Sequence, residues 1–355
     1  PFPAVFRAGL GVSDSQFSLA LALRQGAGVA GPFLASVADS RGRKTGMVFG
    51  LLVFSAGIAV FLLFPGFPTF VLALILSLVG NFVFMPSMQA YLGDLTPYAQ
   101  RGQVMGLTEL SWSASFFLGM PAVGWALDRL GWKAPFPFFL ALSLLAVLAL
   151  LRILPRDQAR DGKKVGLWKN LSQVLNYPPA LAGLLLGICM SSANELVNMT
   201  FSSWLQDSFQ VTLGLLGTAA VAIGLAELAA ELLSTGLTDR LGKPRSVTLG
   251  FVVNILAFLA LPLLGQSLPG ALVALFMIYL SFEFTVVSSI PLMTEVLPAT
   301  RATFMATWIA SLSLGRALAD LVAFPVLNRG ILAVAGVGIL LNLLGLAALR
   351  RVRSA

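Results

Sequence analysis

The residues best able to do chemistry in this sequence are acids placed inside long apolar stretches. The chain of 355 residues has no histidine, so carboxylates are the plausible proton carriers. A buried charge costs roughly 2.5–3.5 kcal/mol on insertion scales, so an unpaired acid there should hold a proton or line a wet cavity. The acids inside apolar stretches are Glu109, Glu195, Glu227, Glu231, Glu283 and Asp320, and the basic residues there are Arg24 and Arg316.

Pairing cannot neutralise all of these acids. Two arginines form at most two one-to-one pairs, which leaves 6 − 2 = 4 acids over. A buried structural ion pair remains the alternative explanation of Arg316 and Asp320. We therefore expect the candidates for proton coupling to be the five glutamates, Glu109, Glu195, Glu227, Glu231 and Glu283.

One apolar stretch, residues 180–205, also carries a polar stripe. Its polar residues recur at i, i+3, i+4, i+7 and i+11, the spacing of one helix face: Ser191, Asn194, Glu195, Asn198 and Ser202. Lipid would penalise that face, so it must look onto water or protein.

The stretches themselves indicate a membrane protein. Residues of the AVILMFWYC set make up 57% of the chain and charged residues 11%, where a soluble domain carries about 25% charged residues. Runs of about 20 apolar residues span a bilayer, and runs this long must be helices, because lipid cannot satisfy the backbone polar groups. We expect eleven spans, at 15–37, 45–64, 69–91, 102–126, 134–154, 180–205, 212–236, 246–264, 270–294, 302–325 and 331–349.

Two charged hinges show that the chain is duplicated. Residues 36–46 read S-V-A-D-S-R-G-R-K-T-G and residues 236–246 read G-L-T-D-R-L-G-K-P-R-S, so Asp39 and Asp239 lie at an offset of 239 − 39 = 200. Gly42 and Gly242 share that offset. The span at 180–205 then lacks most of a first-half partner, so we number the visible helices 2 to 12. The predicted domains are a bundle at 1–154, a linker at 155–179 and a bundle at 180–355.

The distribution of basic residues predicts the orientation. With the Asp39 hinge on the cytoplasmic side, that side holds 17 Lys and Arg residues against 4 on the other, which fits the positive-inside rule. The net charge of +8 is thus topological and gives no reason to expect nucleic acid as a partner. The linker reads as a basic amphipathic helix on the inner leaflet or as a flexible connection. We expect a multi-pass protein of a bacterial cytoplasmic (inner) membrane.

Three motifs resemble those of a known family. The hinge Asp39-Ser40-Arg41-Gly42-Arg43-Lys44 resembles the cytoplasmic loop signature of the major facilitator superfamily, with an arginine moved to the third place. The span at 102–126 is similar to the helix that carries the antiporter signature of its drug:proton antiporters. Gly119 and Gly124 fit that signature, whereas Met120 and Val123 depart from it, and small residues there equally explain close helix packing. Residues 124–136 resemble the family's turn between helices 5 and 6.

The resemblance implies an all-α fold of two pseudo-symmetric six-helix bundles, with the first helix largely absent from this chain. It implies that helix 2 neighbours helix 11, that helix 5 neighbours helix 8, and that Asp39 and Asp239 bond to the starts of helices 11 and 5. The implied cytoplasmic gate comprises Asp39, Gly42, Arg43, Arg101, Asp239, Gly242 and Arg301. The implied substrate cavity is lined by Asn81, Met85, Gln89, Ser191, Asn194, Glu195, Asn198, Tyr279 and Glu283.

These features predict a secondary transporter that works by alternating access. The sequence contains no nucleotide loop, metal-ligand cluster or nucleophilic triad, so we expect neither an enzyme nor a cofactor. An acidic cavity with methionine and aromatic residues favours proton-coupled efflux of lipophilic or cationic small molecules by a monomer. The alternatives are uptake or facilitated transport of a polar metabolite or sugar, and a non-transporting membrane sensor or lipid-handling protein.

The proton role is expected to centre on Glu195 and Glu283. Two carboxylates opposed across one cavity would favour a shared proton that a cationic substrate could displace. Arg316 is the complication, because an arginine that reaches either glutamate would keep that acid ionised and structural.

Overall fold

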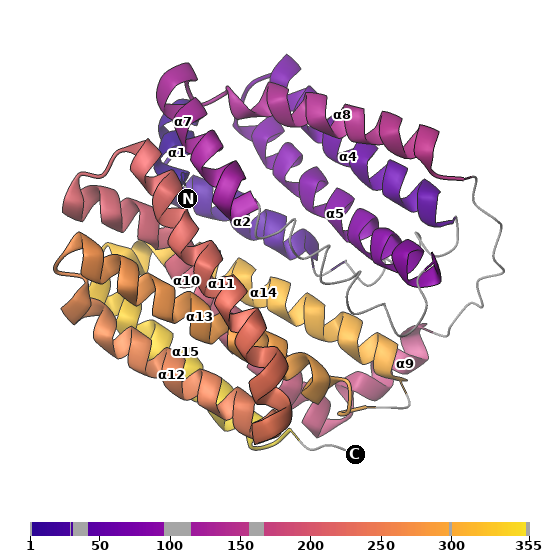
Figure 1. The fold of residues 1–355 in the computed structure, drawn as a ribbon, viewed down its shortest axis with the longest axis vertical. Coiled ribbons are helices and arrows are strands. Elements are labelled where there is room, and N and C mark those ends of the chain that lie inside the picture. The colour runs from indigo at the N-terminus through magenta and orange to yellow at the C-terminus, as the bar shows by residue number, and fades with distance from the viewer. Residues whose placement is uncertain are drawn as a thin grey trace.

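The computed structural model describes residues 2–28, 30, 42–95, 115–155, 167–297 and 300–352. Regular structure in these ranges is entirely helical. The helices form two groups lying side by side (Figure 1), the first half of the chain in indigo to magenta and the second half in pink to yellow.

The first half contains both short and long helical elements. Its elements are α1 (Pro3–Leu10), α2 (Asp14–Gly28), α4 (Arg43–Leu63), α5 (Phe67–Leu95), the π-helical turn η2 (Ser115–Gly119), α7 (Met120–Leu130) and α8 (Pro135–Ile153). Helix α9 (Leu167–Leu175) lies within the predicted linker and packs against the second half. The second half comprises α10 (Pro178–Phe209), α11 (Leu213–Leu241), α12 (Lys243–Leu264), α13 (Leu268–Met293), α14 (Arg301–Leu327) and α15 (Ile331–Leu349).

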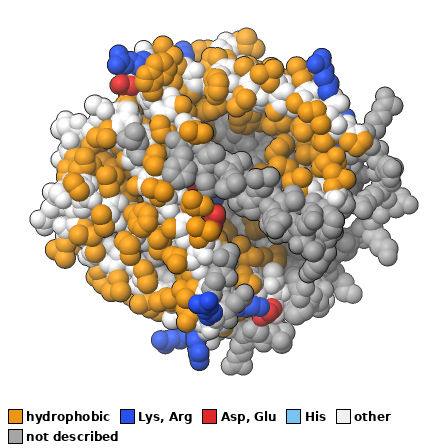
Figure 2. Space-filling model, viewed as in Figure 1, with side chains coloured by type: hydrophobic (Ala, Val, Ile, Leu, Met, Phe, Trp, Pro, Cys, Tyr) orange, Lys and Arg blue, Asp and Glu red, His pale blue; other side chains and the backbone are white. Residues whose placement is uncertain are grey.

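Most of the expected spans appear as single helices. Within the described ranges, nine helices are long and apolar enough to cross a membrane. The other two expected spans, 15–37 and 102–126, run partly through residues outside those ranges. The face in Figure 2 fits this reading, because hydrophobic side chains cover most of its described surface and the visible Lys and Arg side chains lie at its margins.

The backbone itself repeats between the halves. All residues with left-handed φ in the described ranges fall into pairs one repeat apart: Gly11 with Gln210 (210 − 11 = 199), Gly42 with Gly242 (242 − 42 = 200) and Gly131 with Gly330 (330 − 131 = 199). Five of the six are glycine, the residue that adopts this conformation without steric cost. The chain therefore makes the same sharp reversals at equivalent helix ends in both halves.

Helix starts follow the same repeat. The Ser13 hydroxyl accepts a hydrogen bond from the Gln16 amide at 3.3 Å, and the Ser13 amide donates back to the Gln16 side chain at 3.0 Å. The Thr212 hydroxyl, 212 − 13 = 199 residues later, accepts from the Leu215 amide at 3.3 Å. These side chains bond amides that have no partner within the helix, which fixes the starts of α2 and α11.

The halves join along two helix pairs, which confirms the neighbours that the resemblance implied. Helix α2 packs on α14, and α7 packs on α11. We call the end of the bundle that carries Gly42 and Gly242 the hinge end, and the end that carries Gly131 and Gly330 the far end. Both named contacts join helices from opposite halves.

Aromatic side chains close the far end. Phe2 and Leu127 of the first half are buried in the same apolar cluster as Phe201 of the second. In a separate cluster, Phe324 of α14 is buried among first-half phenylalanines, and the Arg7 guanidinium lies 4.6 Å from the centre of the Phe324 ring. Burial of this apolar surface, together with the cation–π contact, stabilises the joined far end.

The implied gate is only partly described. Asp39 and Arg101 lie outside the described residues, and so do the side chains of Asp239 and Arg301. Gly42 and Gly242 occupy equivalent positions before α4 and α12, with φ of 98° and 85°. The bonds expected from Asp39 and Asp239 to helix starts therefore stay predictions.

The α7–α11 contact predicts a size limit at Gly217. A Cβ there would lie 2.9 Å from the Met120 carbonyl oxygen and 3.0 Å from the Pro121 Cα, so backbone would have to move. Gly217→Ala should therefore destabilise the protein by about 1–3 kcal/mol, measured as a lower melting temperature in detergent.

Gly214 provides the control on the same helix. A Cβ at Gly214 meets no atom within 4 Å, so Gly214→Ala should leave the melting temperature unchanged or raise it. Equal effects of the two substitutions would contradict the close α7–α11 contact.

Candidate functional site

A chain of polar contacts crosses three helices of the second half. Tyr279 of α13 donates its hydroxyl to the Asn198 side-chain oxygen at 3.1 Å. Asn198 in turn donates its amide to a Glu195 carboxylate oxygen, also at 3.1 Å. The other Glu195 oxygen lies 4.0 Å from Nε of Arg316 on α14. Glu195 is thereby held from two sides, and its side chain is only 8% exposed.

Two further charges complete this group. Arg24 of α2 lies within electrostatic reach of Glu195, Asp320 and Arg316. Asp320 of α14 is 1% exposed and lies within electrostatic reach of Glu195, Arg24 and Arg316. We call Arg24, Glu195, Arg316 and Asp320 the charge cluster. It contains two acids and two arginines, so it is formally neutral.

The charge cluster is shared between the halves. Arg24 comes from the first half, whereas both acids and Arg316 come from the second. Removing one member of a buried charge group leaves its partners uncompensated, which costs about 3–5 kcal/mol. Neutrality at this site therefore depends on α2 staying against α14.

Asp320 is the least satisfied member of the charge cluster. Neither of its carboxylate oxygens has a hydrogen-bond partner among the residues that the structure describes. Its compensation comes from the charges of the two arginines and not from a direct bond. A buried carboxylate without donors is costly when ionised, so Asp320 is well placed to accept a proton.

Small residues bring the helices of the charge cluster together. A Cβ at Gly28 of α2 would lie 2.7 Å from the Ser313 hydroxyl of α14. On the other side of α14, the Ser192 hydroxyl donates to the Gly315 carbonyl at 2.7 Å. A Cβ at Gly315 would lie 2.4 Å from the Ile188 carbonyl oxygen of α10. Because α14 is packed this tightly on both neighbours, Arg316 and Asp320 are fixed between them.

The structure gives Glu195 and Glu283, the two glutamates expected to share the proton role, different surroundings. It places Glu195 beside Arg316, so an arginine does reach one of the two glutamates. Glu283 lies one turn beyond Tyr279 on α13 and is half-buried. The structure gives no direct ion pair between Arg316 and Asp320 in the described part of the chain, because Asp320 has no bonded partner there.

The remaining predicted residues lie in varied surroundings. Glu227 is half-buried within electrostatic reach of Tyr279, and Glu231 is half-buried one turn further along α11. On α5, Met85 is half-buried while Asn81 and Gln89 are exposed. Glu109 lies outside the described residues.

Two polar residues of the α10 stripe differ in what they bond. Ser191 is buried and donates to the Gly187 carbonyl of its own helix at 2.9 Å. Its hydroxyl also lies against Gly315 of α14, so Ser191 is part of the α10–α14 contact. The side-chain oxygen of Asn194 is buried without a partner among the described residues. Asn194 therefore keeps an open acceptor next to Glu195.

What sequence reasoning missed is that Glu195 shares its site with Arg24 and Asp320. The sequence places these three residues on three separate helices and gives no spacing that joins them. The available signal was the implied pairing of helix 2, which carries Arg24, with helix 11, which carries Arg316 and Asp320.

Many secondary transporters are built, like this chain, from two repeated halves of membrane-spanning helices. The sequence model of the Major Facilitator Superfamily matches residues 1–319. The chain therefore belongs to the major facilitator superfamily.

Curated relatives are similar over part of their length. Multidrug resistance protein 2 of Bacillus subtilis is 26% identical over 265 residues, which covers 72% of this chain and 65% of the relative. The quinolone resistance protein NorA of Staphylococcus aureus is 24% identical over 58% of this chain and 54% of its own length. The match thus spans less than two thirds of these relatives.

Solved structures share the fold. A bacterial homologue of the human lysosomal transporter Spinster, in an inward-facing and unoccupied conformation, has a TM-score of 0.69 at 15% identity, covering 98% of this chain and 88% of that one. The human organic anion transporter MFSD10 has a TM-score of 0.65 at 20% identity, covering 99% and 88%. At these identities the likeness concerns the fold alone.

The charge cluster predicts coupling between residues of opposite halves. Arg24→Gln and Asp320→Asn should each lower stability, by up to about 3–5 kcal/mol, because each leaves a net buried charge. The double variant should lose about 0.5–3 kcal/mol less than the sum of the two, because it restores neutrality. Melting temperatures of the four proteins in detergent measure this.

The control cycle pairs Arg24→Gln with Asp207→Asn. Asp207 is an exposed acid near the end of α10, outside the charge cluster, so these two effects should add. Additive effects in both cycles would refute the electrostatic link between α2 and α14.

Proposed function

We propose that the protein is a proton-coupled secondary transporter that exports lipophilic or cationic small molecules by alternating access. The observation that carries the proposal is the charge cluster, in which two acids of one half are compensated partly by an arginine of the other. Such an arrangement links the protonation of an acid to the relative position of the halves.

The coupling step follows from charge balance. While α2 packs on α14, Arg24 and Arg316 offset the charges of Glu195 and Asp320. If the halves rock apart at the far end, Arg24 moves away with α2 and one negative charge is left over. A proton from the newly admitted water can neutralise that negative charge, with Asp320 as the acceptor. Protonation then favours the separated state, and release of the proton favours the joined one.

The substrate would meet the polar chain that begins at Tyr279. Glu195, Asn198 and Tyr279 offer a carboxylate, an amide and an aromatic ring, which together suit a cation with apolar surface. A bound cation can offset Glu195 in place of Arg316 or of a proton. Competition of this kind makes substrate binding and proton binding exclusive, as antiport requires.

The names of the relatives support the efflux direction. Multidrug resistance protein 2 and the quinolone resistance protein NorA are both resistance proteins, and both align with more than half of this chain. A sensor that does not transport would need neither a charge shared between the halves nor an acid without hydrogen-bond donors.

The test is transport of tetraphenylphosphonium, a lipophilic cation, in proteoliposomes with an imposed pH gradient. Glu195→Gln and Asp320→Asn should each reduce gradient-driven transport by at least about tenfold, because the first removes the carboxylate that a cation would meet and the second replaces the proton acceptor with an amide that cannot exchange a proton. Glu283→Gln tests Glu283, the other glutamate on which the sequence predicts the proton role to centre. Asp128→Asn, at an exposed acid of α7, is the control that should transport like the unaltered protein.

The outcomes separate the candidate acids. Gradient-driven transport that survives Glu195→Gln, Asp320→Asn and Glu283→Gln would remove the charge cluster from coupling and move the proton role to Glu109, Glu227 and Glu231. Absence of any gradient-dependent flux in the unaltered protein would contradict proton-coupled export of such cations.

A further inference from the structure

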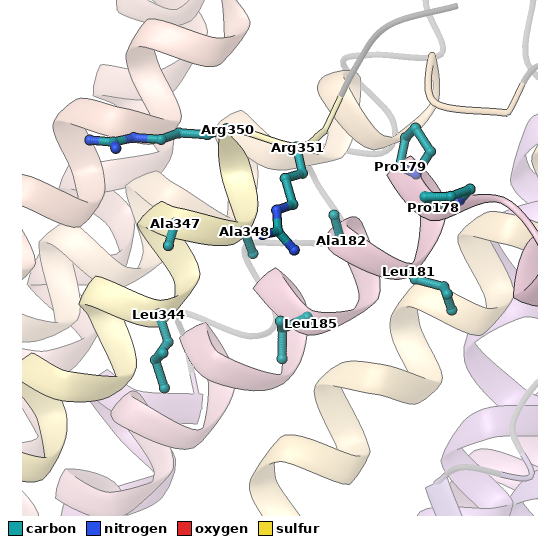
Figure 3. Close-up of a pocket in the computed structure, with 10 residues that line it drawn as sticks. All are labelled: Pro178, Pro179, Leu181, Ala182, Leu185, Leu344, Ala347, Ala348, Arg350 and Arg351. Carbon is teal, nitrogen blue, oxygen red and sulfur yellow. The ribbon is translucent and has the colours of Figure 1, made fainter.

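A groove on the outer face of the second half has no role in the proposed transport. It lies between the start of α10 and the end of α15, at the hinge end, and its volume is about 720 Å³. Its residues are Pro178, Pro179, Leu181, Ala182, Leu185, Leu344, Ala347, Ala348, Arg350 and Arg351. Figure 3 shows these side chains around the space between the two helices.

The groove combines an apolar floor with a basic mouth. Leu181, Leu185 and Leu344 line it deeper in the apolar part of the helices, while Arg350 and Arg351 stand directly after α15. In Figure 3 the Arg351 guanidinium points into the space between α10 and α15, and Arg350 extends away from it. The described residues that line the groove include no acid, so none of them offsets the positive charge at its mouth.

Small residues keep the groove open. Ala182 and Ala347 stand on its walls, where larger side chains would fill the space. The leucines of the floor keep a large exposed surface, with Leu181, Leu185 and Leu344 between 43% and 48% exposed as whole residues. In a membrane-spanning bundle, an exposed apolar surface at this depth faces lipid chains and not water.

We propose that this groove binds an anionic phospholipid of the leaflet at the hinge end. One acyl chain lies along the leucines, and the phosphate meets Arg351 at the mouth, with Arg350 adding attraction. A guanidinium donates two parallel hydrogen bonds to a phosphate, which makes arginine well suited to this contact. Basic clusters directly after a membrane span attract anionic lipids, and the sequence continues this one as Arg350-Arg351-Val352-Arg353.

Charge complementarity selects this occupant. A zwitterionic lipid would gain the same apolar contact, but its own cationic group would weaken the attraction to two arginines. A free phosphate would meet Arg351 but leave the leucine floor uncovered. Only an anionic lipid uses both parts of the groove.

Native mass spectrometry of the purified full chain in detergent provides the test, with phosphatidylglycerol, phosphatidylcholine and inorganic phosphate as probes. The unaltered protein should bind phosphatidylglycerol more tightly than phosphatidylcholine, and inorganic phosphate should not compete. Arg350→Gln with Arg351→Gln should weaken phosphatidylglycerol binding roughly fivefold for each arginine removed. Ala347→Phe fills the groove at an exposed position and should weaken the binding of both lipids.

Two matched controls should leave lipid binding unchanged. Arg245→Gln removes an exposed arginine from the same half and the same end of the bundle. Val252→Phe adds bulk at an exposed position of α12 outside the groove. The proposal is overturned if the arginine pair can be removed without loss, if phosphatidylcholine binds equally well, or if inorganic phosphate displaces the lipid. Melting temperatures establish that each variant is folded.

Discussion

Charges inside an apolar bundle must be balanced within it, and much of this structure serves that balance. Water cannot screen Glu195 and Asp320, so two arginines must lie near them, and one of these, Arg24, belongs to the opposite half. The contact between the halves is therefore electrostatic as well as apolar. A rearrangement that separates α2 from α14 would remove Arg24 from the two acids, and the proposed proton coupling rests on this loss of charge balance.

Close helix packing makes this balance specific. Gly28 lets α2 approach the Ser313 side chain of α14, and Gly315 lets α14 approach the α10 backbone at Ile188. Helix α14, which carries Arg316 and Asp320, is therefore held close to both neighbours. The α7–α11 contact uses Gly124 and Gly217 in the same way. The glycines of the antiporter-like segment thus differ: Gly124 packs against α11, whereas among the described residues Gly119 approaches only the side chain of Ser115 in its own segment. Close packing accounts for Gly124 without any reference to antiport.

The repeat accounts for the shape of the bundle, and departures from it indicate where function can lie. Equivalent reversals at Gly42 and Gly242 and at Gly131 and Gly330 give the halves matching paths. The charges do not repeat in this way, because three of the four members of the charge cluster belong to the second half. The proposed transport site is correspondingly asymmetric within a nearly symmetric frame. The basic groove of α10 and α15 likewise stands on the second half.

The sequence by itself determined the helical membrane fold, the two halves and which acids lie inside the apolar stretches. Apolar runs this long span a bilayer as helices. The offset of 200 residues between Asp39 and Asp239 is a property of the sequence alone. The sequence could not determine which acid lies near which arginine, because Arg24, Glu195 and Asp320 belong to helices whose rotation and spacing are set by packing. The tertiary structure decided that Glu195 lies between Asn198 and Arg316, and that Asp320 is buried without a hydrogen-bond partner among the described residues. Side-chain partners across helices depend on close contacts at residues such as Gly28 and Gly315, and hydrophobic periodicity does not encode those contacts.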